Sequence, residues 1–309
     1  TIPPFPSNLP TAEIHTVDFA ALLNGSKEES RKVYEAATGY GFFYLSNHDV
    51  DYNFMFDLAN AIFSLPNTEK MKYDMGATGH YFGYKRSGAM FVDDKGTPDR
   101  SEFYNISKDE ILGIGERGAH PSPHPQVVTE RKAQLDEYMR SCHRVVTGLV
   151  DALGKELGLD PELLPSLHLL DRPSVCQARV THAPPVSEDT ICLGEHTDFG
   201  SITVLFNQLG GLQALEPNSR EWKYITPKPD CAIINLGDSF VKLCGGRLYS
   251  AVHRVMGPPG EQARSNRHSV VYFARPNSDV KLRSLFDPPP TKEEEDQLMN
   301  ADAWVANRA

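Results

Sequence analysis

His196 and Asp198 are two strong metal ligands separated by a single residue. On an extended strand, residues two apart project from the same face, so both side chains can reach one ion. His253 is the best candidate for a third ligand because apolar residues alternate around it, as on a strand that enters a core. Two imidazoles and one carboxylate would leave about three positions of an octahedral ion open, the arrangement of non-haem Fe(II) oxygen chemistry. Two alternatives stay open: the His-x-Asp tripeptide can arise by chance, and His253 can be a hydrogen-bonded core histidine.

A second pair of polar residues follows His253 along the chain. Arg267 and Ser269 lead into the apolar run 270–273 and would share one face of a strand. A guanidinium and a hydroxyl aimed into a β-barrel form a charge-assisted clamp for a carboxylate, which suits the far end of a dicarboxylate cosubstrate. A buried arginine without such an anion would be costly. For Arg267 taken alone, a surface salt bridge is the alternative.

The second half of the chain must position these residues. Residues 171–290 contain short apolar or alternating runs bounded by Gly, Pro and Asn, which is typical of a jelly roll. We expect strands over 175–181, 202–206, 212–215, 232–236 and 270–274.

The first half of the chain reads mainly as helix and loop. A capping-box pattern at Ser26 predicts a helix that closes at Gly39, and a second helix ends before Pro66. The longest apolar stripe runs from Leu135 to Leu157, and we assign it to packing rather than to a cofactor. We therefore predict a mixed α+β protein with a double-stranded β-helix (jelly-roll) core and flanking helices that are mostly N-terminal. Its regions would be 1–170, 171–290 and a helical tail over 291–309, joined in one compact unit.

The composition narrows the class of protein. The 309 residues are 40% hydrophobic and 23% charged, which excludes wholesale disorder. The net charge of −10, from 31 basic and 41 acidic residues, argues against nucleic acid as a partner. No apolar run is long enough to span a membrane. The five cysteines form no CxxC pair, which favours a reduced, cytoplasmic compartment, and the oligomeric state stays open.

Several further segments occur together with these residues and in a fixed order. They are Gly41-Phe42-Phe43-Tyr44-Leu45-Ser46-Asn47-His48, Gly194-Glu195-His196-Thr197-Asp198-Phe199-Gly200-Ser201-Ile202-Thr203-Val204-Leu205, Gly210-Gly211-Leu212-Gln213, Asn235-Leu236-Gly237-Asp238, Gly246-Arg247-Leu248-Tyr249-Ser250, His253-Arg254-Val255 and Arg267-His268-Ser269. In this order they closely resemble the Fe(II)/2-oxoglutarate-dependent dioxygenases of the isopenicillin-N-synthase-like group. The resemblance covers roughly residues 14 to 276.

The resemblance implies a site and a reaction. Iron would be held by His196, Asp198 and His253, and 2-oxoglutarate would chelate it while Arg267 and Ser269 meet the far carboxylate. Dioxygen would be consumed, succinate and CO₂ released, and a small organic molecule oxidised, with ascorbate as a supporting reductant. Hydroxylation is the default outcome, and desaturation, cyclisation or ring expansion are the variants, as in specialised metabolism. The alternatives are an oxidase that uses iron and O₂ without 2-oxoglutarate, and a ligand-binding relative without turnover.

The chain departs from the family's pattern ahead of the metal motif. Where many members have Asn-Tyr-Tyr-Pro, this chain has Thr181-His182-Ala183-Pro184. Ala183 in place of tyrosine implies either a larger pocket or a different hold on the cosubstrate carboxylate. His182 would be a pocket residue or a structural histidine.

Substrate contacts are expected mainly from the aromatic-rich loop region 76–107, which suits a lid over a small, largely apolar substrate. Similar enzymes line the cavity mouth with segments that correspond to Tyr84, Lys85, Arg86, Phe103 and Arg247. Phe273 lies at even spacing from Arg267 and Ser269, so it would face either the pocket with them or the core.

Overall fold

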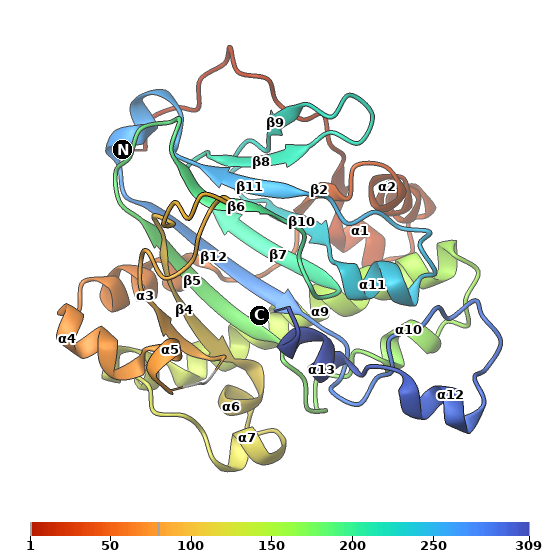
Figure 1. Cartoon of the computed structure of the whole chain (residues 1–309). Helices are drawn as coiled ribbons and strands as arrows, with labels where there is room; N and C mark the ends of the chain where they lie inside the picture. The colour runs from red at the N-terminus through yellow and green to blue at the C-terminus, as the bar shows by residue number, and fades with distance from the viewer. Residues whose placement is uncertain (1, 79–80, 309) are drawn as a thin grey trace.

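The computed structural model describes residues 2–78 and 81–308 (Figure 1). An eight-stranded sheet forms its centre, because alternating apolar residues on each strand bury one face against helices. In order across this sheet the strands are β1 (Thr16–Asp18), β2 (Phe42–Ser46), β10 (Ala232–Leu236), β7 (Ile202–Asn207), β12 (Arg267–Ala274), β5 (Gln177–Ala183), β4 (Glu102–Ser107) and β3 (Gly83–Lys85). Among the described strands of this sheet, β1 and β2 pair in parallel and the other neighbours pair antiparallel.

A smaller antiparallel sheet lies against the other face of the large one. Its order is β6 (Ile191–His196), β11 (His253–Met256), β8 (Leu212–Leu215) and β9 (Trp222–Tyr224). The apolar residues between the sheets, including Phe42, Leu205 and Val271, form a core separate from the one under the helices. Together the two sheets make the jelly roll, so the predicted mixed α+β fold is confirmed.

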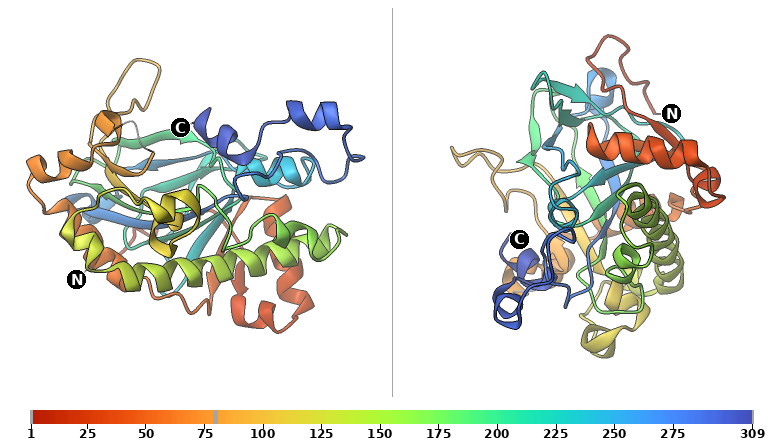
Figure 2. Two further views of the ribbon diagram at one scale, coloured as in Figure 1. Left: turned by 90° about the horizontal axis from the view of Figure 1, so that it is seen from below. Right: turned by 90° about the vertical axis from the view of Figure 1, so that its right-hand side faces the viewer.

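Helices surround the sheets, mostly from the first half of the chain. They are α1 (Phe19–Leu23), α2 (Lys27–Thr38), α3 (Asn53–Phe63), α4 (Asn67–Lys70), η1 (Met71–Tyr73), α5 (Met75–Thr78), α6 (Lys108–Leu112), α7 (Gly115–Ala119), α8 (Gln126–Thr129), α9 (Lys132–Glu156), α10 (Leu163–Ser166), α11 (Asp238–Leu243), η2 (Gly260–Arg264), α12 (Lys292–Gln297) and α13 (Ala301–Ala306). Figure 2 shows α2 and α9 together on the outer side of the large sheet. None of the helices in the described ranges is long and apolar enough to cross a bilayer.

The predicted helices form because their local signals agree with the packing. Ser26 caps α2 by accepting a hydrogen bond from the Glu29 amide. Glu29 does not complete the predicted capping box, because its carboxylate instead accepts a hydrogen bond from the Asp18 amide across to β1. The stripe from Leu135 to Leu157 lies on α9 and packs into the main core, as expected.

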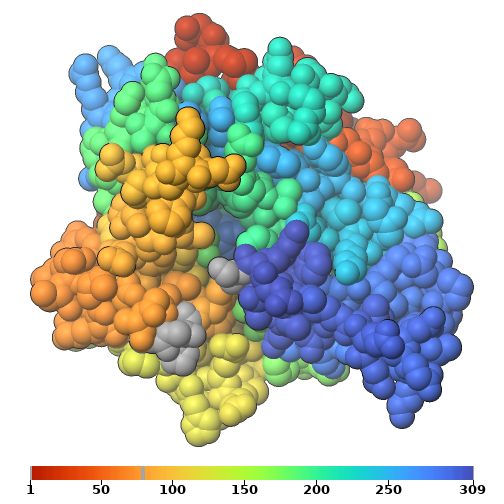
Figure 3. All heavy atoms as spheres, viewed as in Figure 1, coloured from red at the N-terminus to blue at the C-terminus, as the bar shows by residue number. Residues whose placement is uncertain are grey.

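The loop between β3 and β4 joins the two sheets at one end of the barrel. The amide of Arg100 and the hydroxyl of Ser101 both donate to the carbonyl of Cys192 on β6, each at 3.4 Å. Val92 in this loop lies close to Gly194 on β6. A Cβ atom on Gly194 would be only 2.8 Å from the carbonyl oxygen of Val92. In the space-filling view the surface is hollowed between this loop and α13 (Figure 3).

Candidate functional site

Three predicted ligands converge at the end of the small sheet. His196 closes β6 and His253 opens β11, and the two residues are direct cross-strand partners. Asp198 lies in the turn that follows β6. One ligand atom from each residue falls within 4.8 Å of the others. The Asp198 Oδ1 atom is 4.0 Å from Nε2 of His196 and 3.9 Å from Nε2 of His253.

Backbone carbonyls orient both imidazoles. Nδ1 of His196 donates to the carbonyl of Gly194 at 2.8 Å, and Nδ1 of His253 donates to that of Ala251 at 3.0 Å. Each ring therefore directs its Nε2 toward the centre, and Nε2 is the atom that an imidazole protonated at Nδ1 offers to a metal. Burial, with the neighbouring His253, lowers the pKa of His196 to about 4, which keeps that ring neutral.

The carboxylate is held in the same way. Oδ2 of Asp198 accepts hydrogen bonds from the Thr203 hydroxyl and the Asn235 amide, both at 2.6 Å, which leaves Oδ1 for a metal. Burial opposes ionisation of Asp198, but the two histidines and these two hydrogen bonds outweigh it and lower its pKa. Two imidazoles and one carboxylate that point at one spot fit Fe(II) by the chemistry of the donor set.

Arg267 and Ser269 lie on the inner face of β12, where they were expected. Arg267 is only 4% exposed, and its Nε donates to the Gly210 carbonyl at 2.8 Å. No described carboxylate forms an ion pair with it, so a buried cation faces the cavity without a counter-ion from the chain. Burial lowers its pKa to about 10, which still leaves it charged. Ala183 lies directly opposite Arg267 in the strand register, so a small side chain stands beside the guanidinium where many members of the family have tyrosine.

Phe103 and Phe273, two of the expected substrate contacts, also face inward. Phe103 on β4 pairs with Thr181 on β5, which in turn pairs with the inward Ser269 on β12. Phe273 lies on the same face of β12 as Ser269 and pairs with Thr203 on β7. Lys85 faces the same side, but an ion pair with Asp99 occupies its ammonium group.

The structure does not bring Tyr84, Arg86, His182 or Arg247 to the triad. Tyr84 and His182 lie on the outer face of the large sheet, because they alternate with the inward residues of β3 and β5. Both hydrogen-bond to Glu102, and with Arg86 they line a separate cavity of about 520 Å³. Arg247 is exposed, and its guanidinium stacks on Phe286 at 3.4 Å. The resemblance located the right segments, but strand alternation turned these side chains away from the site.

Sequence reasoning missed several residues around the triad. Thr203 and Asn235 were part of quoted motifs, yet only the pairing of β7 with β10 reveals that both contact Asp198. Asp238 does more than form a turn, since its carboxylate accepts a hydrogen bond at 2.8 Å from Thr197, the residue between two ligands. Arg179, two residues before Thr181 on β5, also faces inward, and its parity along the strand was the available signal.

Comparisons with known proteins agree with this geometry. Residues 14–126 match the family model described as non-haem dioxygenase in morphine synthesis N-terminal, and residues 174–276 match that of the 2OG-Fe(II) oxygenase superfamily. The chain is 29% identical over 282 residues to the 2-oxoglutarate-dependent dioxygenase frbH of Dothideomycetidae sp. (strain 11243), with 89% of this chain and 85% of frbH covered.

Two solved structures are similar over nearly the whole chain. A putative 2OG-Fe(II) oxygenase family protein from Caulobacter crescentus is 27% identical with a TM-score of 0.79, and 96% of this chain and 98% of that chain are covered. A full-length protein of Neurospora crassa, solved in complex with alpha-KG and thymine, is 24% identical with a TM-score of 0.79, and 96% of each chain is covered.

Proposed function

Because the chain belongs to the Fe(II)/2-oxoglutarate-dependent dioxygenase family and is an enzyme of that class, we propose that His196, Asp198 and His253 hold its iron. Arg267 and Ser269 bind the far carboxylate of 2-oxoglutarate. The observation that carries this assignment is that the Nε2 atoms of both histidines and the free Oδ1 of Asp198 meet at one point. The uncompensated cation of Arg267 on the same inner surface supports it.

When bound, the iron and 2-oxoglutarate would activate dioxygen, and 2-oxoglutarate would be converted to succinate and CO₂. The chain's own residues fix where this happens. The carbonyls of Gly194 and Ala251 orient the imidazoles, and Asn235 and Thr203 direct one carboxylate oxygen toward the centre. Arg267 orients the cosubstrate by pairing with its charge in a buried position, where the pairing is strong.

We propose a small organic molecule as the substrate and hydroxylation as the default outcome. Phe103 and Phe273 give the inner surface near the triad an apolar, aromatic character. The surface is hollowed between the β3–β4 loop and α13 (Figure 3), and we propose this hollow as the entrance for the substrate. Among similar proteins, the one from Neurospora crassa was solved with thymine, a small molecule, in its complex.

The oxidase alternative, in which Arg267 would hold a substrate carboxylate and no 2-oxoglutarate would bind, is not favoured. Proteins that are similar to this chain over most of its length are named as 2-oxoglutarate-dependent dioxygenases. A ligand-binding relative without turnover has no use for three converging ligands with an open side.

An anaerobic titration of the Fe(II)-loaded protein with 2-oxoglutarate tests the assignment. We expect a saturable visible charge-transfer band in the wild type, no iron binding in His196→Ala, and a band that needs roughly tenfold more 2-oxoglutarate in Arg267→Ala, from the loss of a charged hydrogen bond. Arg172→Ala removes an exposed arginine from a surface ion pair and serves as the matched control. Stoichiometric iron without any band would favour the oxidase, and a normal titration of Arg267→Ala would remove Arg267 from the cosubstrate site.

A further inference from the structure

Arg179 is a further inward-facing cation on the large sheet, besides Arg267 and the ion-paired Lys85. It lies on β5, in register with Val271 of β12 and Asn105 of β4. Its Nε donates to Oδ1 of Asn105 at 2.7 Å, and Asn105 is fully buried. Asn105 is neutral, and no carboxylate in the described ranges forms an ion pair with Arg179. The chain therefore provides a cation on the cavity surface without providing its counter-charge.

Aromatic rings fix the plane of this guanidinium. Its carbon lies 3.9 Å from the centroid of Phe103 and 4.9 Å from that of Phe273. Cation–π contacts of this kind hold the group rigidly. Asn105 and the side chain of Tyr81 take up part of the five N–H donors of the guanidinium. Burial lowers the pKa of Arg179. The nearby Tyr81 and Asp198 oppose this shift, whereas the charge of Arg275 adds to it. The guanidinium thus lies within electrostatic reach of the metal carboxylate.

The position of Arg179 separates it from the cosubstrate clamp. Arg267 and Val271 are four residues apart on β12, a separation of about 13 Å along a strand. Phe273, which contacts Arg179, pairs with Thr203, and Thr203 hydrogen-bonds to the metal ligand Asp198. The two cations therefore serve different parts of the cavity, with Arg179 toward its metal end.

We propose that Arg179 binds a carboxylate group of the oxidised substrate, so that the substrate class is a small, largely apolar carboxylic acid. This inference rests on the proposed function, because it places the substrate beside the metal of that site. The charge of the guanidinium selects a carboxylate over neutral groups, since an anion supplies the missing counter-charge in a poorly hydrated place. Phe103 and Phe273 contribute the apolar contact surface for the rest of the molecule. Arg179 is thus a residue that determines specificity.

The test uses benzoate as a carboxylate probe and benzamide as its neutral counterpart. Each is titrated anaerobically into the holoenzyme with Fe(II) and saturating 2-oxoglutarate, and the shift of the charge-transfer band is followed. We expect benzoate to shift the band at concentrations roughly tenfold or more below those needed for benzamide. Arg179→Gln should remove this preference, and Arg179→Lys should restore part of it. Arg247→Gln is the matched control, because Arg247 also stacks on a phenylalanine but lies outside the barrel.

The outcomes separate this inference from the function on which it rests. If Arg179→Gln keeps the wild-type preference for benzoate, or if the wild type does not discriminate between the probes, the inference is wrong. The same holds if benzoate only removes the band without shifting it, because it then competes with 2-oxoglutarate at Arg267. If 2-oxoglutarate produces no band in any variant, the proposed function has failed and this inference fails with it. Melting temperatures of both Arg179 variants exclude unfolding as the cause of a loss.

Discussion

At the scale of single residues, the site depends on hydrogen bonds that aim ligand atoms. Asp198 has two equivalent oxygens, and the side chains of Thr203 and Asn235 occupy one of them. Without these donors the carboxylate could rotate away from the metal or bind it in another mode. The precision of the triad therefore comes from neutral side chains on β7 and β10 as much as from the ligands themselves.

We expect Asn235→Leu and Thr203→Val each to weaken Fe(II) affinity by about tenfold, in line with other metal sites that lose an outer hydrogen bond. Both variants keep an apolar body of similar size, so the fold should persist. Anaerobic iron titration measures the effect, and Asn307→Leu at an exposed position provides the control. Unchanged iron affinity in both variants would show that Asp198 is held by the backbone alone.

At the scale of elements, α13 and the residues just after it hold the turn that carries Asp198. The indole of Trp304 donates to the carbonyl of Phe199 at 2.9 Å, and Arg308 pairs with the Asp238 oxygen that also accepts from Thr197. The N-terminal amides of α11 hold the same turn from the other side, with the Asp238 amide donating to the Asp198 carbonyl at 2.8 Å. Two helices distant in sequence thus fix residues 197–199.

We expect Arg308→Ala to weaken iron binding about threefold to tenfold, because the Asp238 carboxylate loses its partner and releases Thr197. Arg308→Lys should restore most of the affinity, since it keeps the charge. Iron titration and the melting temperature of the metal-free protein are measured together. A lower melting temperature with unchanged iron affinity would mean that α13 stabilises the fold without positioning the site.

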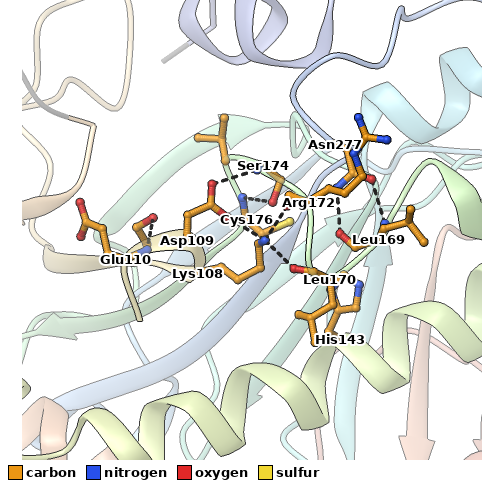
Figure 4. Close-up of polar contacts among 12 residues, drawn as sticks. Lys108, Asp109, Glu110, His143, Leu169, Leu170, Arg172, Ser174, Cys176 and Asn277 are labelled. Carbon is orange, nitrogen blue, oxygen red and sulfur yellow. Dashed lines mark hydrogen bonds and ion pairs between the residues drawn. The ribbon is translucent and has the colours of Figure 1, made fainter. Parts of the chain in front are cut away.

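At the scale of the whole molecule, a buried polar cluster connects the N-terminal region to the jelly roll (Figure 4). Lys108 is fully buried on α6. Its ammonium donates to the carbonyls of Leu170 and Arg172, both at 2.9 Å, and pairs with Asp109 at 2.7 Å. The other oxygen of Asp109 accepts from the Ser174 amide at 3.0 Å, just before β5. The cluster therefore joins the segment after β4 to the segment that leads into the core strands.

We expect Lys108→Met to lower the free energy of unfolding by about 3 kcal/mol, because it leaves a buried carboxylate and two carbonyls without their donor. Urea unfolding followed by circular dichroism measures this. Lys155→Met on α9 breaks an exposed ion pair with Asp151 and should change stability by less than about 1 kcal/mol. Equal effects of the two substitutions would contradict a special role for the buried cluster.

The sequence by itself predicted the kinds of elements, the proposed metal triad and the Arg267–Ser269 pair. His196 and Asp198 are two apart, and Arg267 and Ser269 are two apart, so strand geometry alone puts each pair on one face. The helix that ends before Pro66 and the helix over the long apolar stripe on α9 followed equally from local signals.

Only the tertiary structure decided what lies around those residues. The contacts of Asp198 with Asn235, of Thr197 with Asp238, and of Arg179 with Phe273 join strands and helices far apart in the chain. Which face of the sheet is inward also depends on the pairing of β3, β4 and β5, and this turned Tyr84 and His182 outward. The physical reason is that strand periodicity fixes which side chains share a face, whereas burial against a partner element fixes what that face meets.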